Sequence, residues 1–151
     1  MKIYLYKLLK PYQVLREDQG GVYGVNVGAN IYREPVNSYS VTISFTSAPE
    51  NLDKLMGLVM DEIKTLKEKG ASQTNIEKVI AEDTRGMETA VKENNYWLYN
   101  LEQKYFHNED PITILEDSKI VRQLTVARTK ELANKYFKED NVAKFVLLPE
   151  K

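Results

Sequence analysis

The sequence predicts an α+β fold, in which an antiparallel β-sheet is covered by helices on one face. Two adjacent runs alternate apolar and polar residues, which is typical of half-buried β-strands. The stretches that follow repeat apolar residues at steps of three and four, which is typical of helices. At most about three strands then face about five helices, and so narrow a sheet leaves two exposed edges. The 151 residues therefore form one domain at most, and we expect part of a larger sheet.

The first part of the chain predicts a helix followed by a hairpin. Residues 2–17 carry apolar side chains at helical spacing, and Pro11 predicts a kink or a helix that starts only near it. Two glycines at 20 and 21 end this helix, since glycine accepts the conformation that closes a helix. Residues 22–32 and 38–46 alternate with period two, and the turn residues 34–37 between them predict an antiparallel hairpin.

Two amphipathic helices are expected next. Ser47 and Glu50 have the spacing of a capping box at the start of the first, and Gly70 supplies its C-terminal glycine. Ser72 is the predicted N-cap of the second. Both helices carry an apolar stripe along one side, which indicates that they pack on the sheet or on each other.

The last part of the chain predicts further helices and a closing strand. Asn94 and Asn95 are weak helix formers, so they predict a break before an aromatic-rich helix. A short helix begins at Pro111, and Thr125 is the expected cap of the last helix. Residues 142–148 (VAKFVLL) predict a final strand.

Composition excludes several kinds of protein. The chain has no cysteine and one histidine, His107, so it contains neither a thiolate site nor a zinc site built on paired imidazoles. We expect His107 to be a solvated or capping residue, and we predict no metal and no cofactor in this chain. The net charge of −1 and the absence of a basic stripe argue against a nucleic-acid partner. No apolar stretch approaches the about 18 residues of a membrane span, and the N-terminal segment does not fit a signal peptide, so we expect a soluble chain without a membrane partner.

Arg16 and Tyr23 are the candidate binding residues. The segment that joins them puts a guanidinium at the end of a helix and a phenol at the start of a strand, seven positions apart. Both groups donate hydrogen bonds to a carbonyl oxygen or to a developing oxyanion. The ordinary alternative is that Arg16 pairs with Glu17 or Asp18 at the surface and that Tyr23 is a strand aromatic, and the residues alone favour it.

Several separated motifs resemble one known family. The run LREDQGGVYGV, followed by SFTSAPENLDKL, KENNYWLYNL, NEDP and a final VLLPE, is similar to the C-terminal homologous domain of insulinase and pitrilysin-type zinc peptidases, which include the mitochondrial processing peptidases. The similarity runs from about Leu15 to the C-terminus, while residues 1–14 match the family poorly. The resemblance implies that residues 1–151 are one truncated C-terminal domain of a larger zinc peptidase.

The resemblance also implies a division of labour. Members of this family carry zinc on a His-x-x-Glu-His motif in an N-terminal domain, and a second domain without the motif closes over the peptide. Arg16 and Tyr23 match the family residues that contact the substrate backbone near the scissile carbonyl. The zinc motif is absent here, so we expect no catalytic residue and no hydrolysis by the isolated chain. The implied partners are the N-terminal zinc-binding domain or subunit and peptide substrates.

Three further groups are assigned to structure. The glutamates and aspartates of residues 77–93 mix with Lys and Arg and predict a solvated helix face. The glycines near residue 20 are not a phosphate loop, because no Lys-Ser/Thr follows and the segment leads from helix to strand. The aromatic residues of 96–106 are expected mostly in the core, with part of the set lining the family's substrate chamber.

Three hypotheses on function remain. In the first, the chain is the substrate-clamping domain of a zinc metalloendopeptidase whose compartment is periplasmic or cytoplasmic. In the second, it is a non-catalytic structural or peptide-binding subunit of the processing-peptidase type. In the third, it is a truncated reading frame with no role of its own. For the isolated chain we expect self-association through a sheet edge or an exposed apolar face.

Overall fold

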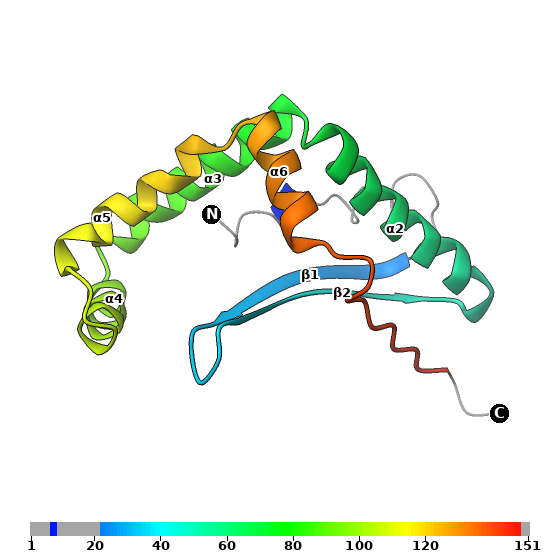
Figure 1. Ribbon diagram of the computed structural model, residues 1–151, viewed down its shortest axis with the longest axis horizontal. Coiled ribbons are helices and arrows are strands. Elements are labelled where there is room, and N and C mark those ends of the chain that lie inside the picture. Colours follow the sequence, from blue (N-terminus) through cyan, green and yellow to red (C-terminus); the bar gives the residue numbers. More distant parts are fainter. Residues whose placement is uncertain (1–6, 9–21, 149–151) are drawn as a thin grey trace. The chain divides into compact units, whose positions relative to one another are not determined.

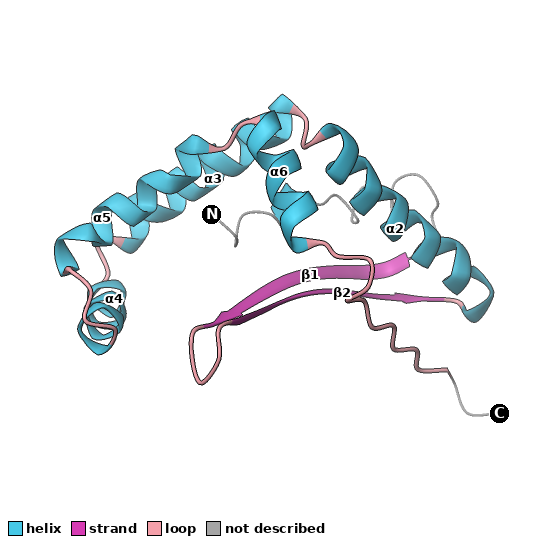
Figure 2. Cartoon of the chain, in the orientation of Figure 1, coloured by secondary structure: helices cyan, strands magenta, loops and turns pink. Residues whose placement is uncertain are grey.

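The chain folds into two compact units, each described here by itself. The structure is a computed structural model that describes residues 7–8 and 22–148 (Figure 1). The hairpin unit contains residues 22–71 and 126–148 together with residues 7–8, and the helical unit contains residues 72–125. The strands within the described residues form one two-stranded antiparallel sheet, and the rest of the regular structure is helical (Figure 2). The predicted α+β class is confirmed.

The hairpin joins β1 (Val22–Tyr32) to β2 (Ser38–Ser47) in antiparallel register. Val27 lies opposite Ile43, and both are half-buried, while the polar residues between the apolar ones are mostly exposed. Helices α2 and α6 of the same unit lie over one face of this ribbon (Figure 1). The alternation therefore gives the hairpin one covered face and one open face, as the period-two pattern predicts.

Helix α2 (Leu52–Lys69) begins differently from the prediction. A 3-10 turn, η2 (Pro49–Asn51), precedes it, and the N-cap of this turn is Ala48 without a side-chain cap. Ser47 is the last residue of β2, where it pairs with Val22, and its hydroxyl donates to the Ala48 carbonyl at 3.2 Å. The predicted capping box is wrong because the strand ladder holds Ser47 in extended conformation one residue too early to cap the turn.

Thr129 fastens the end of α2 to helix α6 (Val126–Tyr136). Its side-chain oxygen accepts a hydrogen bond from the Ala71 amide at 2.9 Å and donates one to the Val126 carbonyl at 2.7 Å. Gly70 ends α2 with φ of 77°, as the C-terminal glycine predicts, and a Cβ there would lie 2.4 Å from the Val126 carbonyl oxygen. The close approach of these two helices therefore requires both a glycine and a short hydroxyl side chain.

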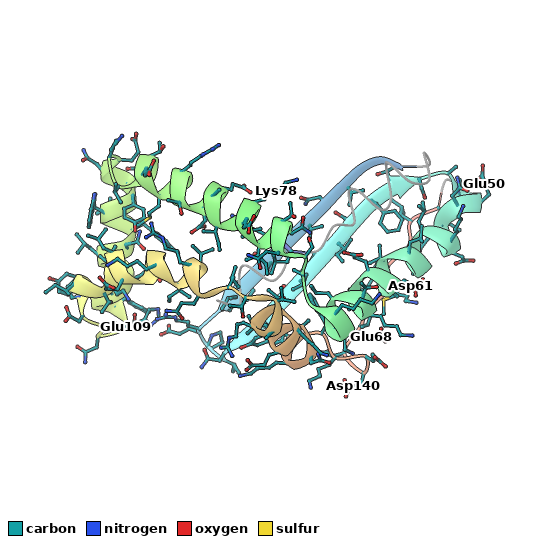
Figure 3. The ribbon with its side chains drawn as sticks, turned by 90° about the horizontal axis from the view of Figure 1, so that it is seen from above. Glu50, Asp61, Glu68, Lys78, Glu109 and Asp140 are labelled. Atoms are coloured by element: carbon teal, nitrogen blue, oxygen red, sulfur yellow. The ribbon has the colours of Figure 1, made fainter. Side chains whose placement is uncertain are left out.

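Polar contacts also join α2 to the chain after α6. Asn134 donates to the Lys67 carbonyl at 2.7 Å, and the Lys67 ammonium donates to the Glu139 carboxylate at 2.9 Å. Other charged residues, such as Glu50, Asp61 and Glu68, are exposed along η2 and α2 (Figure 3). These groups form the solvated side of the helix, opposite the buried Leu55 and Leu66.

The helical unit contains α3, α4 and a run of short helices. Their bounds are α3 Gln73–Ala90, α4 Asn94–Phe106, η3 Pro111–Thr113, α5 Ile114–Asp117 and η4 Ser118–Gln123. Ser72 caps α3 by accepting from the Asn75 amide, as predicted. The predicted break lies at residues 91–93, where the Trp97 indole donates to the Val91 carbonyl at 2.9 Å and satisfies a carbonyl at the helix end.

The prediction that the aromatic residues of α4 lie mostly in the core is wrong. None of the residues of α4 is buried, and its partly covered aromatics are Tyr96 and Trp97. Tyr99, Tyr105 and Phe106 are exposed by more than half of their surface. Helix α4 contacts the short turn η3 within its unit, and that contact is too small to cover more than one side of the helix.

The predicted closing strand is also absent from the structure. Residues 142–148, called here the C-terminal segment, have no regular secondary structure. Phe145 is 94% exposed and Leu147 is 98% exposed, while Val146 between them is 50% exposed. This alternation is that of an extended chain, but the sheet of the described residues contains β1 and β2 alone. The C-terminal segment has the composition of a strand, but its backbone does not pair with either strand of this sheet.

Candidate substrate-binding site

Of the two candidate residues, the structure describes the backbone of Tyr23 but not Arg16. Arg16 lies outside the described residues. The backbone of Tyr23 belongs to β1 and lies between Val22 and Gly24, the first two paired residues of that strand. Val22 pairs with Ser47 and Gly24 pairs with the preceding residue of β2, so Tyr23 is the extra residue of a β-bulge. The predicted contact between Arg16 and Tyr23 at one substrate group is not tested by this geometry.

The bulge at Tyr23 lies at the end of the hairpin where β2 leads into η2. A bulge bends its strand and interrupts the ladder, and bulges occur often beside functional sites because they re-aim the chain. The start of β1 therefore differs from the regular pairing that follows it from Gly24 to Tyr32. We take this end of the hairpin as the candidate substrate-binding site.

The open face of the hairpin extends from this end and carries small, uncharged residues. They are Gly24, Asn26, Gly28 and Asn30 of β1, opposite Thr46, Ser44, Thr42 and Ser40 of β2. Amide and hydroxyl groups both donate and accept hydrogen bonds, as the backbone of an extended peptide does. A Cβ at Gly24 or Gly28 would meet nothing within 4 Å, so the two glycines leave the face flat rather than crowded. The face is suited to binding and lacks the groups that acid and base catalysis requires.

The sequence prediction found part of this face. The period-two pattern of residues 38–46 puts Thr42, Ser44 and Thr46 at its polar positions, and all three are exposed. Asn26 and Asn30 were not singled out, although both are exposed and lie opposite Ser44 and Ser40. The signal that could have found them is the same alternation, since they occupy the polar positions of β1.

The hairpin unit contains an ion pair that shifts a pKa. The Lys67 ammonium, through its hydrogen bond and its charge, lowers the pKa of the Glu139 carboxyl. That pair joins α2 to the chain after α6 and is exposed on the glutamate side. No three His, Asp or Glu side chains among the described residues are grouped so as to hold a metal ion. His107 is the C-cap residue of α4, and its ring packs edge-to-face on Phe106.

A second candidate on the hairpin unit is a small recess beside Tyr136. Tyr39 packs edge-to-face on Tyr136 and donates from its hydroxyl to the Tyr136 carbonyl at 2.9 Å. The recess has a volume of about 10 Å³ and is otherwise lined by residues 29–31 and 40–41. This is the space of a single water molecule, so the recess is not a ligand site.

None of the helices in the described ranges is long and apolar enough to cross a membrane.

Comparisons with known proteins agree on the class of protein. Residues 9–82, which include both Arg16 and Tyr23, match the model of the peptidase M16 inactive domain. A zinc protease PQQL-like protein of Arabidopsis thaliana is 31% identical over 109 residues, which are 68% of this chain and 11% of that protein.

Solved structures share the fold. The periplasmic protease PqqL from Escherichia coli aligns with a TM-score of 0.71 and 20% identity over 89% of this chain and 15% of that one. A peptidase M16 inactive domain from Pseudomonas fluorescens aligns with a TM-score of 0.72 and 21% identity over 91% of this chain and 34% of that one.

These findings define the family of proteins to which the chain is related. The chain belongs to the M16 peptidase family and corresponds to part of its inactive domain. It spans about a tenth of the length of the plant relative and about a third of the Pseudomonas structure.

Proposed function

We propose that the chain is the C-terminal substrate-clamping domain of an insulinase-like zinc metalloendopeptidase. In this proposal residues 1–151 form one truncated domain that does not hydrolyse peptides alone. Zinc is bound by a His-x-x-Glu-His motif of an N-terminal domain or subunit, and this chain closes over the peptide. The observation that carries the proposal is the match of residues 9–82 to the family's inactive domain, which includes both candidate residues.

In the proposed enzyme, Arg16 and Tyr23 hold the peptide backbone near the scissile carbonyl. A guanidinium and a neutral phenol both donate to an oxygen on which negative charge develops, so both stabilise the transition state more than the ground state. The bulge at Tyr23 and the flat polar face beyond it support this role, because both suit an extended peptide. The parent enzyme is periplasmic, as the Escherichia coli relative is named, or cytoplasmic.

The kinetic test uses the chain assembled with the zinc-bearing domain or subunit of the proposed enzyme. We expect Arg16→Lys and Tyr23→Phe each to lower kcat/KM on a fluorogenic peptide by roughly 10²-fold, because each removes a donor to the developing charge. Arg33→Lys and Tyr32→Phe, at the opposite end of the hairpin, are matched controls and should leave kcat/KM unchanged. Unchanged kinetics in both test variants would overturn the assigned roles.

The alternative is a non-catalytic structural or peptide-binding subunit of the processing-peptidase type. The exposed apolar side of α4 favours it, because such a surface suits a contact within a complex. The neighbouring sequence separates the two functions. A His-x-x-Glu-His motif in the same or an adjacent gene supports the peptidase, and its absence supports the structural subunit. Under either function we expect the isolated chain to self-associate through an exposed edge or apolar face.

A further inference from the structure

The two strands of the hairpin contain no charged residue. None of the 11 residues of β1 or the 10 residues of β2 is Asp, Glu, Lys or Arg, although 28% of the whole chain is charged. In helix α2 of the same unit, eight of the 18 residues are charged, and most of these are exposed. The open face of the hairpin carries glycines, asparagines, serines and threonines instead. Exposure to water therefore does not by itself explain the composition of this face.

The open face is suited to a partner that supplies hydrogen bonds and no charge. A charged side chain that loses its water without meeting an opposite charge costs much more free energy than an amide or hydroxyl that exchanges water for another hydrogen-bond partner. Another layer of the same domain would pack through apolar side chains, as α2 and α6 do on the other face (Figure 1). Further strands of a larger sheet would pair at its edges. The extended backbone of a peptide fits the face better than either.

Asn26 and Asn30 have the spacing to hold such a backbone. Both are exposed, and no hydrogen bond within the described residues occupies either carboxamide. They are four positions apart on β1, or about 13 Å, which is also the span of four residues of an extended peptide. Each carboxamide donates and accepts, so it pairs with one peptide unit in both directions. Gly28 lies between them, and a Cβ there would meet nothing within 4 Å, which leaves room for a peptide side chain.

We propose that the open face of the hairpin selects peptide segments without charged side chains, with Asn26 and Asn30 as positioning residues for the backbone. This inference rests on the proposed function, because the face adjoins the hairpin end at Tyr23. Asn26 and Asn30 follow Tyr23 by three and seven positions, or about 10 Å and about 23 Å along the strand. The substrate class is a peptide that is uncharged at about these distances from the cleaved bond, on one side of it.

The first measurement compares matched fluorogenic peptides, cleaved by the chain assembled with the zinc-bearing domain or subunit. The peptides differ by one Ser, Lys or Glu, placed in turn at each of the eight positions on either side of the cleaved bond. We expect Lys and Glu both to lower kcat/KM by roughly tenfold at the positions that face Asn26 and Asn30, because either charge loses its water there. Equal cleavage of the three peptides at every position would overturn the proposal. A loss for only one sign of charge would also overturn it.

The second measurement reverses the selection. Asn26→Lys supplies an opposite charge, so the Glu peptide should be cleaved roughly tenfold better than the Lys peptide, and Asn26→Asp should invert that order. Asn37→Lys, in the exposed turn at the far end of the hairpin, is the control and should leave the two peptides equal. It lies about 20 Å along the strand from Asn26, beyond the screening length of about 8 Å. Lys and Glu peptides that respond alike in all three variants would exclude contact at this face.

The third measurement separates positioning from catalysis. Asn26→Ala combined with Asn30→Ala should raise KM several-fold for the neutral peptide and leave kcat unchanged, because a backbone contact of this kind is equally strong in the ground state and the transition state. Asn37→Ala is the control of equal exposure class. All the substituted residues are exposed, so circular dichroism should show the same spectrum for each variant. A lowered kcat with unchanged KM would contradict the positioning role.

These results are separate from the kinetic roles of Arg16 and Tyr23. Unchanged kinetics in Arg16→Lys and Tyr23→Phe would remove those roles and leave the charge selection in place. Equal cleavage of neutral and charged peptides would remove the charge selection and leave those roles. Should no zinc-bearing partner assemble, fluorescence anisotropy of labelled peptides with the whole 151-residue chain gives the same comparison. The neutral peptide should then bind more tightly than the Lys and Glu peptides, and equal binding would overturn the proposal.

Discussion

The strand β2 and the C-terminal segment have similar residues and different structures. β2 pairs with β1 along its whole length, and α2 and α6 lie over its apolar face (Figure 1). The C-terminal segment has no such neighbour among the described residues and exposes Phe145 and Leu147 almost completely. The difference shows that β-propensity alone does not form a strand. A strand needs a paired backbone on at least one edge and a layer over its apolar face.

The largest effect should come from placing the same charge in the two regions. Ile43→Asp puts a carboxylate on the covered face of β2 and should lower the free energy of unfolding by about 3 kcal/mol. Leu147→Asp in the C-terminal segment should change it by less than about 0.5 kcal/mol, because the side chain is exposed in the monomer. Urea denaturation at low protein concentration measures both. Equal losses would show that the C-terminal segment is part of the monomer's core.

An intermediate effect should come from the hydroxyl that holds α6, the helix that leads into the C-terminal segment. Thr129→Val keeps the shape but leaves the buried Ala71 amide without an acceptor, which should cost about 2 kcal/mol. Thr129→Ser retains the oxygen and should recover part of the loss. Thr89→Val on α3 is the control, since that hydroxyl only donates to a carbonyl of its own helix. A Thr129→Val variant as stable as the parent would exclude the role given to this hydrogen bond.

The smallest effect should come from the ion pair between Lys67 and Glu139, which fastens the chain just after α6. The pKa of Glu139 is lowered from its ordinary value of 4.5, so the folded state binds fewer protons than the unfolded state near that pH. The stabilisation is therefore complete above that value and is lost as the pH falls through the lowered pKa. Since the carboxylate is exposed, the effect is small and is screened by salt.

The measurement for this pair compares the pH dependence of unfolding in the parent and in Glu139→Gln. The parent should lose slightly more stability on acidification than the variant, and added salt should remove the difference. Asp140→Asn, one residue further along the chain, is the matched control for a nearby exposed carboxylate. Identical pH profiles of parent and Glu139→Gln at low salt would contradict the assignment.

Local rules predicted the elements whose partners are close in sequence. The existence of the hairpin, the Ser72 cap and the glycine end at Gly70 were predicted from turn, cap and glycine residues at the ends of the elements. The predicted break before α4 is present as well, but it lies at residues 91–93, and Asn94 and Asn95 are the first residues of the helix. In each case the hydrogen bonds that decide the structure are local, so a short stretch of sequence contains both partners.

Predictions failed where a distant partner decides the outcome. The capping role of Ser47 was lost to the ladder with Val22, and the burial of Phe106 depends on a layer that its unit does not supply. The link from Thr129 to Ala71 spans 58 positions and has no sequence signature. The bulge at Tyr23 has no sequence signature either, because a shift in register depends on how the backbones of two strands pair.

The sequence by itself determined the secondary structure class, the absence of a self-contained paired-histidine zinc site, and the resemblance to insulinase-type peptidases that the family match confirms. Those properties depend on residue identity and spacing, and the sequence alone contains both. Only the tertiary structure decided which apolar surfaces are covered. It left α4 and the C-terminal segment exposed because burial and strand pairing require a second surface, and a pattern of residues does not specify whether that surface is present.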